Sequence, residues 1–374
     1  MKIRKLIAAL SAAAVLAVCL TACGNRTADS AAASQTTAGE AAVTEATEST
    51  AESETAEAKT GTGETGAGAT ETAETGNAAE MEAVRVGSLK GPTTMGLVQL
   101  MERSKNGTAE GSYHFSMATQ PDELLARTVS GELDIALVPA NMAAVLYNKT
   151  QGGIAVIDIN TLGVLYCVTG DESIHSVKDL SGKTVLSVGQ GATPEYVLNI
   201  LLEKNGVTDC SVEFKSEATE IAALLKNDPS KIAVLPQPFV TAAQAQNEKL
   251  RTAFSLTEEW DALPDSSRLI TGVTVVRREF LNENAEAVKL FLKEHAESAE
   301  RAAEDLSGTA ALIAEYGIIE KAPIAEKALP ACNIVCISGE EMKAALSGYL
   351  EALSAQDMKA VGGKLPEADF YYTE

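Results

Sequence analysis

The sequence is poor in the residue types on which most catalytic and nucleic-acid-binding proteins depend. Only 3 of its 374 residues are histidine and 4% are aromatic, while 30 basic side chains stand against 52 acidic ones. The net charge of −22 argues against nucleic acid as a partner and against a basic membrane-binding surface. Neither a Gly-x-Ser-x-Gly elbow nor a His-Glu-x-x-His motif occurs.

The three histidines, His114, His175 and His295, have no partner at the spacing typical of metal ligands. The sequence therefore predicts no metal and no cofactor. Gly189-Gln190-Gly191 lacks the third glycine of a dinucleotide motif, and no Gly-Lys-Ser/Thr follows it. A phosphate-loop enzyme is not expected from this pattern.

The N-terminus reads as an export signal. Three basic residues precede the apolar run 6–20, which is short for a membrane span. The run ends in Leu20-Thr-Ala-Cys23-Gly24, which resembles a bacterial lipobox. We therefore expect Cys23 to be lipidated and to anchor the protein to the extracytoplasmic face of the cell membrane. A plain secretory signal with a chance cysteine is the alternative.

A long polar segment follows the signal. Residues 24–83 contain 12 acidic and 2 basic side chains and consist almost wholly of Ala, Thr, Glu, Ser and Gly. Such a composition buries too little apolar surface to offset the entropy lost on ordering. The expected organisation is a signal peptide over 1–22, followed by the lipidated cysteine and a disordered tether over 23–83.

The remaining residues contain an internal repeat. Lys105-Asn-Gly107 recurs as Lys204-Asn-Gly206 at an offset of 99, and Asp134–Pro139 resembles Lys231–Pro236 at an offset of 97. Each copy reads as β-α-β-α-β-α, which predicts an α/β fold of two lobes, each a mostly parallel sheet flanked by helices. A single large doubly wound domain is the alternative.

Two apolar runs are candidates for crossing between the lobes, Leu162–Thr169 and Leu269–Val276. The predicted first lobe therefore comprises 84–162 and 269–374, and the second lobe comprises 163–268. Asn284–Asp305 and the helix after Ser338 are expected to pack over the first lobe. Ser338 and Glu341 predict a capping box at the start of that helix.

Ligands of open α/β sheets bind beyond the carboxyl ends of the strands, where loops lead into helices. Four such loops occur in matched pairs: Gly91–Met95, Pro139–Asn141, Gly189–Thr193 and Pro236–Pro238. Thr193 is predicted to cap a helix that has Pro194 at its first position. Helix starts with free N–H groups favour an anionic or strongly polar ligand. The alternative is that each threonine only caps its helix.

The lipobox, tether and duplicated lobes together resemble the solute-binding proteins of bacterial ABC importers, which have the type II periplasmic-binding-protein fold. The more similar branch binds alkanesulfonates, nitrate, taurine or thiamine precursors. Three segments carry the resemblance: Val84-Arg-Val-Gly87, Gly131-Glu-Leu-Asp134-Ile-Ala136 and Asp179-Leu-Ser-Gly-Lys183. The resemblance covers residues 84 to about 360.

The resemblance implies a ligand site at the four loops. Its contacts carry over to Thr93, Thr94 and Asn141 in the first lobe and to Gln190, Thr193 and Gln237 in the second, with Met95 in the same first-lobe loop. Relatives that bind thiamine precursors use aromatic rings, but here only Tyr196 and Phe239 lie at the loop edges. Relatives that hold a sulfonate often add a basic side chain, for which Arg268 is the candidate.

The resemblance also implies a function. A monomer would capture a small polar or anionic solute between its lobes, close around it and deliver it to an ABC permease, with no chemistry of its own. Two alternatives remain open from the sequence, an enzyme on the same scaffold and a sensory or receptor-type lipoprotein. The cysteines Cys167, Cys210, Cys332 and Cys336 are expected to be buried and free, with one disulfide as the alternative.

Overall fold

The computed structural model describes residues 83–264 and 267–374, all of which belong to one compact unit, Thr75–Glu374. The predicted signal peptide, the lipidation site Cys23 and the tether, apart from residue 83, lie outside the described residues. Within 83–264 and 267–374, none of the helices combines the length and the apolar character that a membrane crossing requires.

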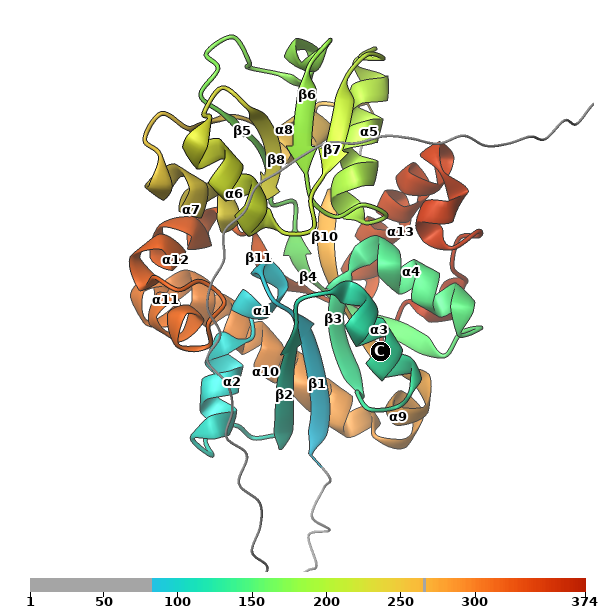
Figure 1. The fold of residues 1–374 in the computed structure, drawn as a ribbon. Coiled ribbons are helices and arrows are strands. Elements are labelled where there is room, and N and C mark those ends of the chain that lie inside the picture. Colours follow the sequence, from blue (N-terminus) through green and yellow to red (C-terminus); the bar gives the residue numbers. More distant parts are fainter. Residues whose placement is uncertain (1–82, 265–266) are drawn as a thin grey trace, which may run out of the picture. The chain divides into compact units, whose positions relative to one another are not determined.

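The described strands form two mixed sheets (Figure 1). The first sheet has the order β11-β4-β10-β3-β1-β2 and the second the order β7-β6-β8-β5-β9. The strands of the first sheet are β1 (Val84–Leu89), β2 (Tyr113–Ala118), β3 (Ile135–Pro139), β4 (Ile154–Leu162), β10 (Ile270–Arg277) and β11 (Ile334–Ile337). Those of the second are β5 (Leu165–Thr169), β6 (Thr184–Ser187), β7 (Ser211–Phe214), β8 (Ile232–Pro236) and β9 (Arg251–Ser255).

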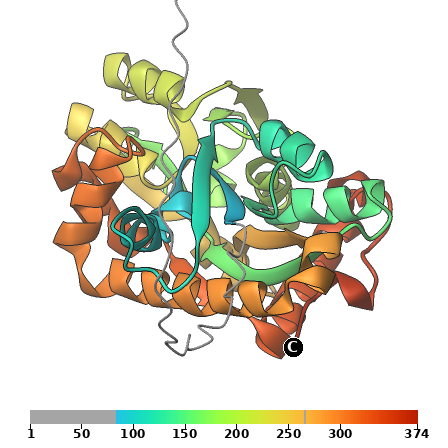
Figure 2. The same ribbon diagram turned by 90° about the horizontal axis from the view of Figure 1, so that it is seen from below.

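Helices connect the strands and flank both sheets (Figures 1 and 2). In the first half they are α1 (Pro92–Met95), α2 (Val98–Lys105), α3 (Pro121–Val129) and α4 (Ala140–Lys149); in the second, α5 (Thr193–Lys204), α6 (Ala218–Asn227), α7 (Phe239–Gln246) and α8 (Leu256–Asp261). The C-terminal part adds α9 (Arg278–Glu283), α10 (Ala285–Glu304), α11 (Leu306–Glu315), α12 (Ala322–Ala328) and α13 (Gly339–Gln356). The predicted fold class, two α/β lobes, is confirmed, but the sheets are mixed and not mostly parallel, because the strands that follow a crossover pair antiparallel with their neighbours.

The repeat inferred from the sequence is visible in the pairing of the strands. β1 pairs in parallel with β2 and β3, and β6 pairs in parallel with β7 and β8. In the first sheet β10 lies antiparallel beside β3, and in the second β5 lies antiparallel beside β8. Both β10 and β5 belong to chain segments that have just crossed from the other sheet. Each half therefore receives one strand from a crossover.

The first predicted crossover is not one continuous strand. The run Leu162–Thr169 is divided, because β4 ends at Leu162 in the first sheet and β5 begins at Leu165 in the second, with only residues 163 and 164 between them. A Cβ added to Gly163 would lie 2.1 Å from Oγ1 of Thr257 at the start of α8. The crossover therefore needs glycine, because α8 approaches its backbone closely.

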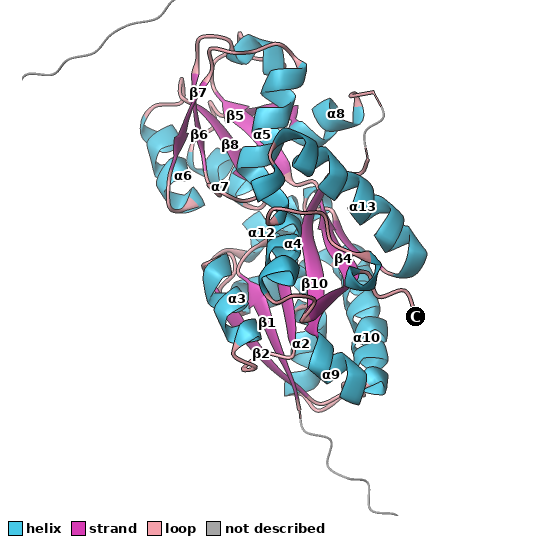
Figure 3. Cartoon of the chain, turned by 90° about the vertical axis from the view of Figure 1, so that its right-hand side faces the viewer, coloured by secondary structure: helices cyan, strands magenta, loops and turns pink. Residues whose placement is uncertain are grey.

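Helix α13 tests two predictions. Ser338 precedes the helix as expected, but its side chain makes no capping hydrogen bond. The helix also packs against α5 of the second sheet as well as against β4 and α4 of the first (Figure 3). Tyr349 of α13 lies with its ring 5.9 Å from that of Trp260 in α8. The helix packs over the first lobe as expected, and it also packs against the second, because its apolar face has residues to bury on both sides.

Candidate ligand site between the two sheets

The first-lobe threonines use their hydroxyls within their own loop. Oγ1 of Thr93 donates to the Leu89 carbonyl oxygen at 2.7 Å, and Oγ1 of Thr94 lies 2.6 Å from the same oxygen and 2.8 Å from Oγ of Ser88. Both threonines and Met95 are buried. These hydroxyls bond the carboxyl end of β1, and neither caps α1, whose N-cap residue is Gly91 and whose start has no side-chain capping bond.

Asn141 connects the two halves directly. It lies in the first turn of α4, and its Nδ2 donates to the carbonyl oxygens of Gly191 and Ala360, each at 3.3 Å. Gly191 belongs to the loop between β6 and α5, so this bond joins a helix of the first half to a loop of the second. The Oδ1 atom of Asn141 is buried and has no hydrogen-bond partner.

Thr193 departs from its predicted role. Ala192 is the N-cap of α5, Thr193 is the first residue of the helix, and no side chain caps the helix start. The Oγ1 atom of Thr193 is buried and unpartnered. It approaches the hydroxyl of Tyr349, which is also buried, but the two do not meet hydrogen-bond geometry. The capping prediction failed because Ala192 adopts the extended N-cap conformation one residue earlier.

The remaining predicted residues lie apart from these atoms or are already paired. Gln190 is exposed on the β6–α5 loop. Gln237 is buried, and its Oε1 accepts from the backbone N–H and the hydroxyl of Thr241 in α7, at 3.3 and 3.0 Å. Arg268 is about half exposed and forms an ion pair of 3.1 Å with Glu341. The structure thus brings Asn141 and Thr193 to the place where α4 of the first half meets the β6–α5 loop of the second. Arg268 instead forms its ion pair with an acidic residue of α13.

We call Asn141, Thr193 and Tyr349 the seam cluster. Each offers a buried polar atom without a partner, and the three come from α4, α5 and α13. A buried polar atom without a partner costs about 1–3 kcal/mol, and a ligand that bonded these three atoms would remove that cost. Burial raises the pKa of Tyr349 well above its ordinary value, so its phenol remains a neutral hydrogen-bond donor.

Sequence reasoning missed Tyr349 because an aromatic residue in the middle of an amphipathic helix is usually core. The signal available was an aromatic residue among the aliphatic core positions of the same helix, Met342, Leu346, Leu350 and Leu353. Only the packing of α13 against α5 brings the phenol to Thr193.

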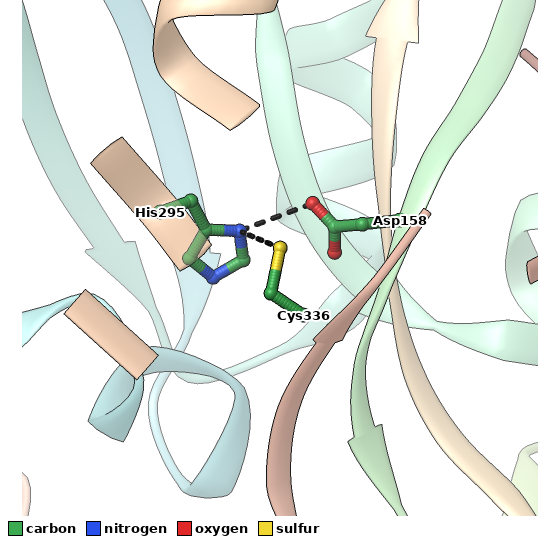
Figure 4. A group of neighbouring side chains, drawn as sticks. All are labelled: Asp158, His295 and Cys336. Atoms are coloured by element: carbon green, nitrogen blue, oxygen red, sulfur yellow. Dashed lines mark hydrogen bonds and ion pairs between the residues drawn. The ribbon is translucent and has the colours of Figure 1, made fainter. Parts of the chain in front are cut away.

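A second group of side chains lies inside the first lobe (Figure 4). Asp158 of β4, His295 of α10 and Cys336 of β11 gather there, and the first two are fully buried. Nδ1 of His295 lies 3.0 Å from Oδ2 of Asp158 and 3.9 Å from Sγ of Cys336. Burial alone would lower the pKa of His295, but the Asp158 carboxylate and the Cys336 thiol raise it to about 10.

Hydrogen bonds extend from Asp158 toward the ligand loops. Oγ1 of Thr274 donates to Oδ1 of Asp158 at 2.7 Å and accepts from Nδ2 of Asn160 at 3.1 Å. A Cβ added to Gly272 would lie 2.4 Å from Oδ1 of Asn160 and 2.6 Å from Cγ2 of Thr93. Hydrogen bonds therefore connect the buried carboxylate through Thr274 to Asn160, and Asn160 and Thr93 both lie close to Gly272.

No local sequence pattern marks this group, since Asp158 and Cys336 stand 137 and 41 residues from His295. His114 and His175, by contrast, are exposed. The four cysteines of the described residues are free, as predicted; Cys167 and Cys332 are buried, and Cys210 and Cys336 are partly buried.

One hollow of the described residues lies away from these side chains. A hollow of about 540 Å³ is lined by residues around the start of β4 and the end of β10, Arg277 and Arg278 among them. The end of β10 pairs with the start of β4 and with the amino end of β3, so the hollow lies at the end of the first sheet opposite the ligand loops. Arg277 and Arg278 are paired with Asp134 and Asp369, and no predicted ligand residue lines the hollow.

Comparison with known proteins bears on both fold and function. The profile of a family described as menaquinone biosynthesis matches residues 91–353, which include strands of both sheets and the whole seam cluster. No curated protein matches the sequence.

Solved structures share the architecture. An ABC transporter structure from Parabacteroides distasonis is 23% identical, with a TM-score of 0.67 over 78% of this chain and 99% of that one. The periplasmic aliphatic sulphonate binding protein from Escherichia coli is 15% identical, with a TM-score of 0.62 over 78% and 92%. The alkanesulfonate-binding protein from Xanthomonas axonopodis bound to MOPS is 15% identical, with a TM-score of 0.57 over 78% and 96%. At these identities the likeness establishes the periplasmic-binding-protein fold alone.

The expectation that the chain carries out no chemistry is wrong. It rested on the resemblance to importer proteins and on the lack of a sequence motif for catalysis, whereas the matching profile is that of a biosynthetic family. The same two-lobed scaffold hosts binding proteins and enzymes, so the fold could not decide between them.

Proposed function

Because the chain belongs to the menaquinone biosynthesis family, we propose that it is an enzyme acting on a small polar intermediate of that biosynthesis. The substrate binds between the two sheets, at the seam cluster of Asn141, Thr193 and Tyr349. The observation that carries the proposed site is the set of three buried, unpartnered polar atoms drawn from both lobes.

The chemistry of the seam cluster favours an oxygen-rich substrate. Oδ1 of Asn141 is an acceptor, the neutral phenol of Tyr349 is a donor, and the hydroxyl of Thr193 can be either. A carboxyl, keto or hydroxyl group would satisfy all three. Because these atoms are shielded from water, hydrogen bonds to charge that develops on the substrate would be stronger there than in solution.

A second candidate role uses the same ligand site and adds delivery of the bound molecule to a membrane permease. Two observations favour it: the lipobox-like sequence at Cys23, and the similarity in fold to an ABC transporter structure and to sulfonate-binding proteins. In this role Cys23 anchors the protein on the extracytoplasmic face of the membrane, and residues 24–83 let the lobes reach the permease.

The test of the proposed function begins with deletion of the gene from its host. Menaquinone in lipid extracts, measured by liquid chromatography and mass spectrometry, is expected to fall, and a substrate is expected to accumulate in the small-molecule extract. The purified full-length chain, added to that extract, should consume the accumulated compound and yield a new mass.

Two results would count against the enzyme. An unchanged amount of menaquinone in the deletion strain would mean that this protein is not needed for menaquinone biosynthesis. A compound that binds to the full-length protein in native mass spectrometry but is recovered with unchanged mass would favour delivery to a permease. Re-expression of the wild-type gene is the control, since it should restore both menaquinone and the normal extract.

A further inference from the structure

Three potential ligand atoms converge inside the first lobe (Figure 4). Oδ2 of Asp158, Nδ1 of His295 and Sγ of Cys336 all lie within 4.8 Å of one another. They come from β4, α10 and β11, which are distant in sequence but adjacent in the fold. A carboxylate, an imidazole nitrogen and a thiol facing one point offer one hard, one borderline and one soft ligand.

The arrangement is not that of a nucleophilic triad. In such a triad the carboxylate and the nucleophile contact opposite nitrogens of the imidazole ring, so that the ring passes a proton between them. Here Asp158 and Cys336 both contact Nδ1 of His295, and Nε2 is buried without a hydrogen-bond partner. A proton cannot be relayed through the ring from the thiol to the carboxylate in this geometry.

The distances fit a small metal ion. Zinc binds sulfur at about 2.3 Å and nitrogen or carboxylate oxygen at about 2.0–2.2 Å, so tetrahedral ligand atoms stand roughly 3.3–3.7 Å apart. The observed separations from Nδ1 are 3.0 Å to the Asp158 oxygen and 3.9 Å to the Cys336 sulfur. Shifts of less than about 1 Å would bring the three atoms to zinc distances.

We propose that Asp158, His295 and Cys336 form a binding site for one zinc-class divalent ion. The protein supplies three ligands, as in open zinc sites, and the fourth position is left to water or another small ligand. Binding displaces the proton at Nδ1 of His295 and the thiol proton of Cys336, and both protons pass to solvent. The ion ties the edge strand β11 and helix α10 to β4.

The surroundings hold the ligands in place. Oδ1 of Asp158 accepts from Thr274, which leaves Oδ2 for the ion, and hydrogen bonds of this kind orient metal ligands in known sites. The ring of His295 lies 5.5 Å from that of Phe291 in the same helix, which restricts its rotation. Cys336 is partly exposed on β11, the edge strand of the first sheet, which offers a route of entry.

The test uses the metal alone on the full-length chain. Protein stripped with EDTA is titrated with zinc chloride in a calorimeter, and with cobalt chloride in an absorption spectrometer. We expect one ion per chain and, for cobalt, a near-ultraviolet charge-transfer band from a thiolate ligand. Cys336→Ser should abolish the band and weaken zinc binding by about 100-fold or more, since loss of a ligand exceeds loss of an outer-shell partner.

A matched control comes from the same segment. Cys332 is buried four residues before Cys336, and its thiol contacts the Ala328 carbonyl oxygen and Met95 instead of the cluster. Cys332→Ala should keep both the zinc affinity and the cobalt band. Equal zinc affinity in the wild type and in Cys336→Ser, or a cobalt complex without a thiolate band, would overturn the proposal. His295→Gln, which removes a second ligand, should also weaken zinc binding. If that variant does not fold, the zinc affinity and cobalt band of Cys336→Ser still test the proposed site.

Discussion

Replacing Thr193 with valine is expected to lower the rate at which the full-length chain consumes its substrate by about 10- to 100-fold, without loss of stability. The hydroxyl of Thr193 has no hydrogen-bond partner inside the protein, so valine removes no internal hydrogen bond. Valine also replaces a buried polar atom without a partner by an apolar methyl group. The same change deprives the substrate of a buried hydrogen bond. The consumption rate is measured in the deletion-strain extract, and stability by thermal unfolding.

Thr94→Val is the matched control for that substitution. Its hydroxyl lies within 2.8 Å of the Leu89 carbonyl oxygen and of Oγ of Ser88, so valine leaves a buried carbonyl with one bond fewer. We expect Thr94→Val to destabilise the fold by about 1–2 kcal/mol and to affect the rate less than Thr193→Val does. If the two variants lose the same fraction of the rate, Thr193 does not bind the substrate.

The contrast between these two threonines shows how far the sequence could predict the site. The repeat placed both at the start of a helix after a strand, and both are buried there. What the sequence could not show is the direction of each hydroxyl. Thr94 turns back onto the end of β1, whereas Thr193 stands one residue beyond the N-cap and has no such oxygen to reach.

The fold was more predictable than the site for a physical reason. The strands and most helices follow from short periodic patterns and from glycine or proline at their ends, which act locally. Tyr349 reaches Thr193 through the packing of α13, and Asp158 meets His295 across 137 residues of chain. Contacts of that kind depend on tertiary packing, and neither pair of residues is separated by a number of residues that would mark it in the sequence.

The second large effect concerns stability and centres on Asp134. Its carboxylate is 2% exposed and accepts from the backbone N–H and Nε of Arg85 at 3.0 and 2.8 Å, and from Nη2 of Arg277 at 3.1 Å. These bonds join β1, β3 and β10 at the amino end of β3. Asp134→Asn would leave two arginines facing a neutral amide, and we expect a loss of about 3 kcal/mol in the free energy of unfolding.

The same carboxylate predicts how stability depends on pH. Burial raises the pKa of Asp134, but hydrogen bonds and charge from Arg85 and Arg277 outweigh it and hold that pKa below its ordinary value. Because the unfolded state then binds the proton more readily, the stabilisation is complete above the unfolded pKa of about 4 and is lost as the pH falls through the lower folded pKa. Asp134→Asn should lack this part of the acid dependence.

Urea unfolding at pH 7 and at several points below pH 5 measures both effects. The control is Glu172→Gln, which removes an exposed carboxylate from the turn after β5 and should change the unfolding free energy by less than about 0.5 kcal/mol at pH 7. Asp134→Asn should lie well below the wild type at pH 7, and the two curves should converge as the pH falls. Parallel curves would mean that the carboxylate is not the group responsible, because an uncharged amide cannot reproduce its titration.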